Sequence, residues 1–274
     1  MQHNAIDAHF HADILMSQEP DFVSTYKTLG LSGLSWSYAH NIGSWRDYPV
    51  YWRHLAEVCV ELTSRGLPCA YLVGIHPRCI PDDLVRQSDV PAELEQEILR
   101  HLQQPNCRGM GELGLETGAA KEINILRRQL ETAAQGLPEG KKVGIHTPRR
   151  NKLQVSRLIL QVLRSSPARR ESLLVDHLDS SVLPLVRDEG YMLGMTLQPG
   201  KSDLNEVKSI LDSDPDMENR LILNSDGARE MSKPFLEAIQ EGMDRASRTW
   251  HKVFFSNSRD FWGLFSAASG RSRP

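Results

Sequence analysis

The 274-residue sequence predicts a (β/α)8 barrel that forms one domain over residues 1–274. Eight short apolar runs of β-forming residues recur along the chain, and segments with helical spacing separate many of them. No linker rich in Pro, Gly or Ser interrupts this alternation. A doubly wound open sheet is the less favoured alternative, because no Gly-rich phosphate-binding fingerprint follows the first run.

The predicted strands follow one another at intervals that parallel strands with right-handed crossovers require. They are AIDAHFHA (5–12), LSGLSWS (31–37), PCAYLVGIH (68–76), RGMGELGLE (108–116), KVGIHT (142–147), SLLVDHLD (172–179), YMLGMTLQ (191–198) and RLILNSD (220–226). The clearest predicted helices cover residues 50–66, 92–104, 121–135 and 151–166.

Composition narrows the class of protein. With 40% hydrophobic residues the chain can bury a large core, and its net charge of -3 argues against a broad basic surface for nucleic acid. The four cysteines form no C-x-x-C pair and are expected to be reduced thiols. The N-terminal residues do not resemble a signal peptide, and no apolar run reaches the ~20 residues of a membrane span. We therefore expect a cytoplasmic protein, and the oligomeric state stays open.

The first predicted strand carries four polar residues in an apolar setting. Alternation along a strand would place Asp7, His9, His11 and Asp13 on one face. Two imidazoles spaced in this way can reach one cation. The alternative is a strand whose histidines are satisfied by ordinary hydrogen bonds.

Further polar residues lie at or near the carboxyl ends of the predicted strands, where the loops of such a barrel converge on one opening. Five of the ten histidines occupy these ends. The full set is His9, His11, His76, Glu112, Glu116, His146, His177 and Asp226. This placement predicts a metal centre at the mouth of the barrel.

The motifs IDAHFH, GIHP, GMGELGLE, GIHT, DHLD and NSDGA, followed by SNSRDFWGLF, resemble in their order the TatD family of metal-dependent hydrolases, in the amidohydrolase superfamily. The likeness spans almost the whole chain. It implies that His9, His11 and Asp226 hold one divalent cation, that Glu112 bridges, and that His146 and His177 hold a second. It also places His76 beside the substrate.

Imidazole and carboxylate ligands without cysteine suit zinc, manganese, cobalt or magnesium. Two such cations per subunit would activate a water molecule, with Asp226 as general base and Glu112 as bridge, to cleave a phosphoester or another ester, lactone or amide bond. A 3'-5' DNA exonuclease is a narrower form of this hypothesis. Two other classes of function are alternatives: a metal-binding barrel with a non-catalytic assembly role, and a deaminase with a single metal.

Several positions depart from the usual family motifs. The family's Glu-Thr-Asp-Ala-Pro corresponds to NSDGA, so that Asn224 takes the place of glutamate, and its His-Cys-Phe is replaced in DHLDS. Glu116 stands where the family has aspartate. These changes leave the ligand set intact and the substrate open.

The expected substrate is a small molecule or a short phosphodiester, since no aromatic and basic groove for a nucleic-acid strand is evident. We expect His76, Arg78, Glu116 and Arg149 to contact it. The cations Arg78, Arg149, Arg150 and Lys152 follow the third and fifth strands and would favour an anionic group if they ring the mouth. Alternatively, they are solvated residues at the starts of helices.

Residues 36–52, WSYAHNIGSWRDYPVYW, concentrate three tryptophans and three tyrosines after the second strand. This segment could form a lid or wall of the site, or it could pack on the outer surface of the barrel. Asp7 could orient a metal ligand or be an ordinary residue of the strand.

Overall fold

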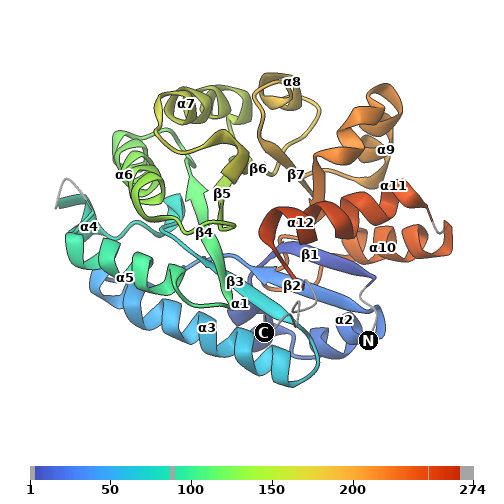
Figure 1. Ribbon diagram of the computed structural model, residues 1–274, viewed down its shortest axis with the longest axis horizontal. Coiled ribbons are helices and arrows are strands. Elements are labelled where there is room, and N and C mark those ends of the chain that lie inside the picture. Colours follow the sequence, from blue (N-terminus) through green and yellow to red (C-terminus); the bar gives the residue numbers. More distant parts are fainter. Residues whose placement is uncertain (1–3, 87–89, 246, 266–274) are drawn as a thin grey trace, which may run out of the picture.

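The computed structural model describes residues 4–86, 90–245 and 247–265. Eight parallel strands follow one another in sequence order around a barrel (Figure 1). The two ends of the sheet meet through a bridge between Phe10 and Gly227. There the His11 N–H donates to the Gly227 carbonyl at 2.8 Å, and the Asp226 N–H donates to the His9 carbonyl at 2.8 Å. The predicted (β/α)8 fold is therefore confirmed.

Each predicted strand overlaps an observed one, and the two begin within one residue of each other. The strands are β1 (Ala5–Phe10), β2 (Leu31–Ser35), β3 (Cys69–Val73), β4 (Cys107–Gly114), β5 (Lys142–His146), β6 (Leu173–Asp176), β7 (Met192–Thr196) and β8 (Leu221–Asn224). Several predicted runs extend past the last paired residue, because the residues that follow a strand turn into the loops at the barrel mouth.

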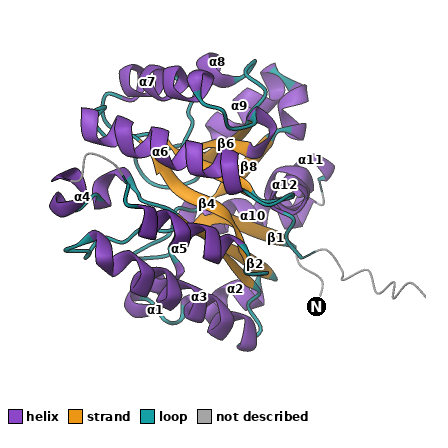
Figure 2. Ribbon diagram, turned by 60° about the vertical axis from the view of Figure 1, so that its left-hand side comes forward, coloured by secondary structure: helices purple, strands orange, loops and turns teal. Residues whose placement is uncertain are grey.

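Helices cover the outside of the barrel (Figure 2). They are α1 (Ala12–Gln18), α2 (Phe22–Thr28), α3 (Tyr48–Ser64), α4 (Asp82–Arg86), α5 (Ala92–Leu102), α6 (Ala120–Gly136), α7 (Lys152–Ser165), α8 (Leu183–Val186), α9 (Leu204–Ser213), α10 (Lys233–Arg245), α11 (Arg248–His251) and α12 (Asn257–Trp262). Among the described residues, no helix is both long and apolar enough to cross a membrane.

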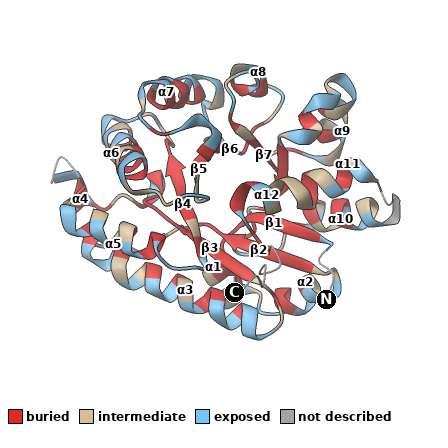
Figure 3. Cartoon of the chain, viewed as in Figure 1, coloured by how far each residue is buried: buried red, intermediate tan, exposed pale blue. Residues whose placement is uncertain are grey.

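Two apolar clusters hold the barrel together. Inside it, Ile6 and Ala8 of β1 pack with Leu34 of β2 and with Trp36. A larger cluster fills the space between strands and helices, so the strands are buried while the outer faces of the helices are exposed (Figure 3). Burial on both faces is typical of parallel strands in such folds.

The prediction that Asp7, His9, His11 and Asp13 share one face of a strand is wrong. Strand β1 ends at Phe10, and its pairing with β2 is irregular between Asp7 and Phe10. The Asp7 carboxylate instead accepts a hydrogen bond from the Tyr26 hydroxyl of α2 at 2.7 Å. Asp13 lies in α1.

Candidate metal centre

A cavity of about 420 Å³ opens at the carboxyl ends of the strands. Most of the predicted site residues line it, namely His11, His76, Arg78, Glu112, His146, Arg149, His177 and Asp226. His9 is fully buried at the side of this group. Segments from six of the eight strand ends thus bring these side chains together.

Glu112, near the end of β4, is the centre of the cluster. Its Oε1 atom lies 2.6 Å from His146 Nδ1 and 3.1 Å from His177 Nε2, and its Oε2 atom lies 3.3 Å from His9 Nε2. Asp226 reaches the same region from the loop after β8, with Oδ1 3.2 Å from His11 Nε2 and 3.6 Å from His9 Nε2. The Glu112 carboxylate therefore contacts predicted ligands of both cations, His9 on one side and His146 and His177 on the other.

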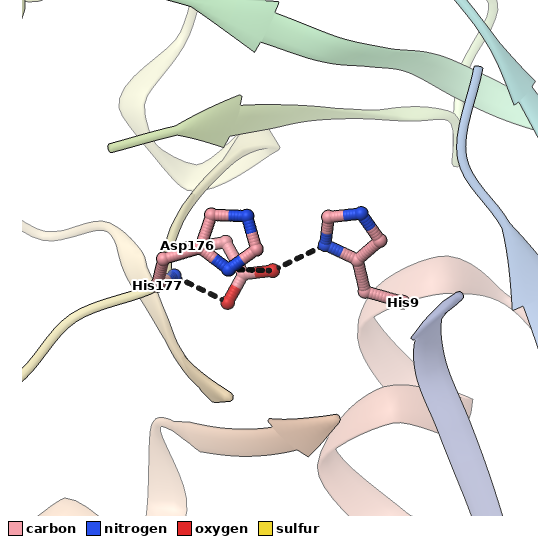
Figure 4. Close-up of side chains that lie close together, drawn as sticks. All are labelled: His9, Asp176 and His177. Atoms are coloured by element: carbon pink, nitrogen blue, oxygen red, sulfur yellow. Dashed lines mark hydrogen bonds and ion pairs between the residues drawn. The ribbon is translucent and has the colours of Figure 1, made fainter. Parts of the chain in front are cut away.

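Hydrogen bonds behind the imidazoles determine which nitrogen faces the cavity. His9 Nδ1 donates to the Asp176 carboxylate at 2.6 Å (Figure 4), and His11 Nδ1 donates to the Trp36 carbonyl at 3.0 Å. These acceptors hold a proton on each Nδ1, so that in the neutral ring each Nε2 is the nitrogen that offers a lone pair to a cation. Both Nε2 atoms point toward Glu112 and Asp226, as metal ligands must.

A chain of hydrogen bonds assigns the same tautomer to His177. Asp176 accepts from the Asn224 amide at 2.9 Å, which turns the Asn224 Oδ1 atom toward Thr196. The Thr196 hydroxyl donates to that oxygen at 2.8 Å, so its own oxygen accepts from His177 Nδ1 at 2.7 Å. His177 Nε2 is then left with its lone pair facing Glu112.

His76 has the opposite arrangement. Its Nδ1 atom accepts the backbone N–H of Arg78 at 3.0 Å, so the ring proton lies on Nε2. That nitrogen faces Glu112 Oε1 at 3.5 Å. His76 therefore offers the cavity a hydrogen-bond donor, and its place beside the substrate stays a prediction.

Glu116 lies behind His146. Its Oε2 atom is 3.1 Å from His146 Nε2, and its Oε1 atom accepts from the Arg78 guanidinium at 2.8 Å. The loop that carries it is fixed by Glu122 of α6, whose carboxylate accepts the backbone N–H groups of Glu116 and Thr117, each at 2.9 Å. Glu116 was expected to contact substrate, but the contacts that it makes here are with His146 and Arg78.

The residues present fit a bound divalent cation. Two ligand atoms that each lie ~2.1 Å from one cation are roughly 3.0–3.5 Å apart at tetrahedral or octahedral angles. The separations of His9 Nε2 from Glu112 and of His11 Nε2 from Asp226, 3.3 and 3.2 Å, fall in this range. His9 Nε2 is buried and has no hydrogen-bond partner. A buried polar atom without a partner is costly, and a cation would satisfy it.

Charge in the cluster is shared between acids and imidazoles. Burial opposes ionisation of Glu112, yet the neighbouring His76 and His9 hold its pKa well below the usual range. Burial also favours neutral His9, but the Glu112 and Asp176 carboxylates raise the pKa of this histidine to about 10. Burial together with the Lys201 ammonium lowers the pKa of His177 to about 3. The acids thus remain ionised and ready to bind a cation.

Sequence reasoning missed several residues of the site. Asp176 was visible in the DHLD motif, but its partner His9 lies 167 residues earlier in the sequence, so the contact between them was not. Lys201 comes from the turn after β7, where its ammonium contacts Asp226. Trp36 stacks on the His9 ring with centroids 4.0 Å apart.

The aromatic segment 36–52 was expected either to form a lid or wall of the site or to pack on the barrel, and its residues do some of each. Tyr38 and His40 line the cavity. Tyr48 and Trp52 belong to α3 and are buried in the core. The segment is therefore partly a wall of the site and partly packing.

The predicted flanking cations are also divided. Arg78 and Arg149 line the cavity, whereas Arg150 and Lys152 do not. Lys152 pairs with Asp179 at 3.1 Å, and Arg150 is exposed. Asp7 accepts the backbone N–H of Ser225 at 3.0 Å, so it supports the loop that carries Asp226 and not a histidine.

Comparison with known proteins shows a likeness to metal-dependent hydrolases. No family model matches the chain. An uncharacterized metal-dependent hydrolase of Methanocaldococcus jannaschii is 27% identical over 230 residues, which cover 81% of this chain and 83% of that protein. The crystal structure of a TatD-like protein from Archaeoglobus fulgidus has 26% identity and a TM-score of 0.73, and the match covers 94% of this chain and all of that one.

A TatD-family hydrolase from Entamoeba histolytica shares the fold, with a TM-score of 0.64 at 14% identity over 95% of this chain and 98% of the other. The barrel, the gathered imidazoles and acids, and the two relatives with higher identity all point to the same class. The chain is therefore similar, in sequence and in fold, to TatD-like metal-dependent hydrolases.

Proposed function

We propose that the protein hydrolyses phosphoesters with two divalent cations held at the barrel mouth. His9, His11, Glu112 and Asp226 would hold one cation, and Glu112, His146 and His177 the second. The observation that carries this proposal is the convergence of the Nε2 lone pairs of three histidines on Glu112 and Asp226. Zinc, manganese, cobalt and magnesium all suit this set of ligands.

Divalent cations at this site supply an activated water at neutral pH and polarise an oxygen of the substrate. Asp226 lies at the cavity surface and is ionised, because the Lys201 ammonium overcomes the effect of burial and lowers its pKa well below the usual range. Its carboxylate accepts the proton of the attacking water and returns it to the leaving group. His76 donates its Nε2 proton to an oxygen of the bound substrate.

The lining of the cavity favours an anionic substrate. Arg78, Arg149, Lys201 and Arg229 all reach it. Guanidinium and ammonium groups bind phosphate oxygens through charge-assisted hydrogen bonds. A small phosphoester or a short phosphodiester fits a cavity of about 420 Å³.

Elemental analysis of the purified protein and a panel of phosphoesters, lactones and single-stranded DNA test the proposal. We expect two equivalents of metal and metal-dependent turnover on phosphoesters that Asp226→Asn abolishes. His54→Ala, at an exposed position of α3, is the control that should retain activity. Protein that binds no metal, or whose metal content is the same after His9→Ala, would contradict the proposal. Turnover on DNA alone would favour the exonuclease.

We also expect a cytoplasmic location. The four cysteines are buried free thiols, as a reducing compartment maintains them.

A further inference from the structure

Several cationic side chains line the cavity. Among the described residues, Lys201 is the one of them whose charged group contacts proposed metal ligands, namely His177 and Asp226. We propose that it is a specificity-determining residue that binds the phosphoryl group of the substrate. This inference rests on the proposed phosphoesterase function and adds a residue that the ligand set does not include.

The turn between β7 and α9 is built to hold Lys201 in the cavity. A bridge pairs Leu197 with Ser202, and the Lys201 N–H donates to the Gln198 carbonyl at 3.0 Å. Gly200 has a φ of 77°, a left-handed conformation that glycine adopts without steric cost. The Ser202 hydroxyl ties the turn to the Leu178 carbonyl at 3.0 Å. As a result the Lys201 side chain is only 4% exposed, although lysines are almost never buried unless they are paired.

The contacts of this ammonium are with residues that a metal would take over. Lys201 Nζ pairs with Asp226 Oδ2 and lies 3.0 and 3.5 Å from the two ring nitrogens of His177. Divalent cations bound to Asp226 and His177 would repel the Lys201 ammonium. They would also weaken its ion pair with Asp226, because the carboxylate would bind the cation. A buried ammonium then needs another negative partner. An anionic group of the substrate, bound beside the cations, supplies it.

The neighbouring residues extend this cationic surface. Arg149 contacts the side-chain oxygen of Gln198, which is a neutral amide. Gln198 in turn donates to the Asp226 backbone carbonyl at 3.1 Å, so it connects Arg149 to the loop that carries Asp226. Lys201 and Arg149 therefore approach the cavity from the same side. A phosphoryl group, with several anionic oxygens, can accept from both.

The test compares Lys201→Met with Lys201→Arg in the metal-loaded protein. The substrates are an aryl phosphate and the neutral aryl acetate with the same leaving group, and inorganic phosphate is the inhibitor. We expect Lys201→Met to raise the KM for the aryl phosphate and the inhibition constant of phosphate by about 10- to 100-fold, the worth of one charged hydrogen bond. Hydrolysis of the acetate should lose much less than hydrolysis of the phosphate, and Lys201→Arg should recover most of the phosphate affinity.

Lys208→Met is the matched control, because Lys208 of α9 pairs with Glu241 outside the cavity. Lys201→Gln provides a second neutral variant if the methionine variant does not fold. Unchanged phosphate affinity in the neutral variant, or an equal loss on both substrates, would overturn the inference. So would a second equivalent of metal gained by Lys201→Met, since Lys201 would then hold the place of a cation.

Failure of the proposed function is distinguishable from failure of this inference. If the wild-type protein does not cleave phosphoesters, calorimetry with inorganic phosphate still measures whether Lys201→Met weakens anion binding. Weakened binding there would support a lysine that recognises phosphate in an enzyme with another scissile bond. Equal binding would overturn the inference in that case also.

Discussion

Replacing Asp176 by asparagine should weaken metal binding while the barrel stays folded. Two donors reach the Asp176 Oδ1 atom, the His177 N–H at 2.6 Å and the Asn224 amide at 2.9 Å. The carbonyl oxygen of a new asparagine is therefore expected at that position. Its amide group would then face His9 Nδ1 and donate to it. The proton of His9 would move to Nε2 and remove the lone pair that a cation needs.

The magnitude follows from these contacts. Loss of a carboxylate that orients a ligating histidine typically reduces metal affinity about 10- to 100-fold. In the metal-free protein the same change removes one charged hydrogen bond, the 2.6 Å contact with His9. We expect a loss of about 1.5–3 kcal/mol in the free energy of unfolding.

Competition with a chromophoric chelator measures the affinity, and urea denaturation measures the stability. Asp179→Asn is the control, because Asp179 belongs to the same DHLD motif but pairs with Lys152 and Ser181. Its metal affinity should match that of the wild-type protein. If Asp176→Asn also binds metal with wild-type affinity, the assignment of the His9 tautomer is wrong.

Three further predictions follow. Since His9 has a pKa of about 10 without metal, metal binding at pH 8 should release a proton, and the apparent affinity should rise about tenfold per pH unit up to that value; calorimetric heats that do not depend on the ionisation enthalpy of the buffer would contradict this. Gly144→Ala places a Cβ 2.2 Å from the Trp36 ring and should cost about 1–3 kcal/mol in urea denaturation, whereas Gly43→Ala, with open space around it, should cost less. Removing the metal with a chelator should lower the free energy of unfolding by about 2.7 kcal/mol if the cation was present at 100 times its Kd; an unchanged unfolding midpoint would refute a bound metal.

The strands could be predicted because each is an apolar run bounded by polar residues. Burial on both faces of a parallel sheet requires this composition, and it leaves few alternatives for a run such as SLLVDHLD. The gathering of His11, His146, His177 and Asp226 was predictable for a related reason. Carboxyl ends of parallel strands meet at one opening, so the position of a residue in its run determines where it lies.

The hydrogen bonds behind the imidazoles could not be predicted. The proton position on His76 depends on one backbone N–H of the following turn, and sequence spacing does not encode it. Lys201 stands in QPGKSD, a composition typical of an exposed turn. The bridge between Leu197 and Ser202 and the hydrogen bond from the Ser202 hydroxyl to the Leu178 carbonyl fold this turn back over the cavity. The prediction that Asp7 shares a face with His9 failed because β1 pairs irregularly with β2 between Asp7 and Phe10. This irregularity interrupts the alternation of side chains between the two faces of the strand.

The contact between Asp176 and Asn224 joins the end of one strand to a position at which this chain differs from the usual TatD motif. Asp176 is the last residue of β6, Asn224 replaces glutamate at the end of β8, and their side chains meet at 2.9 and 3.1 Å. Restoring glutamate at 224 alone would bring two buried negative charges together. A variant library that varies both positions together should therefore recover glutamate at 224 mainly where residue 176 carries no charge.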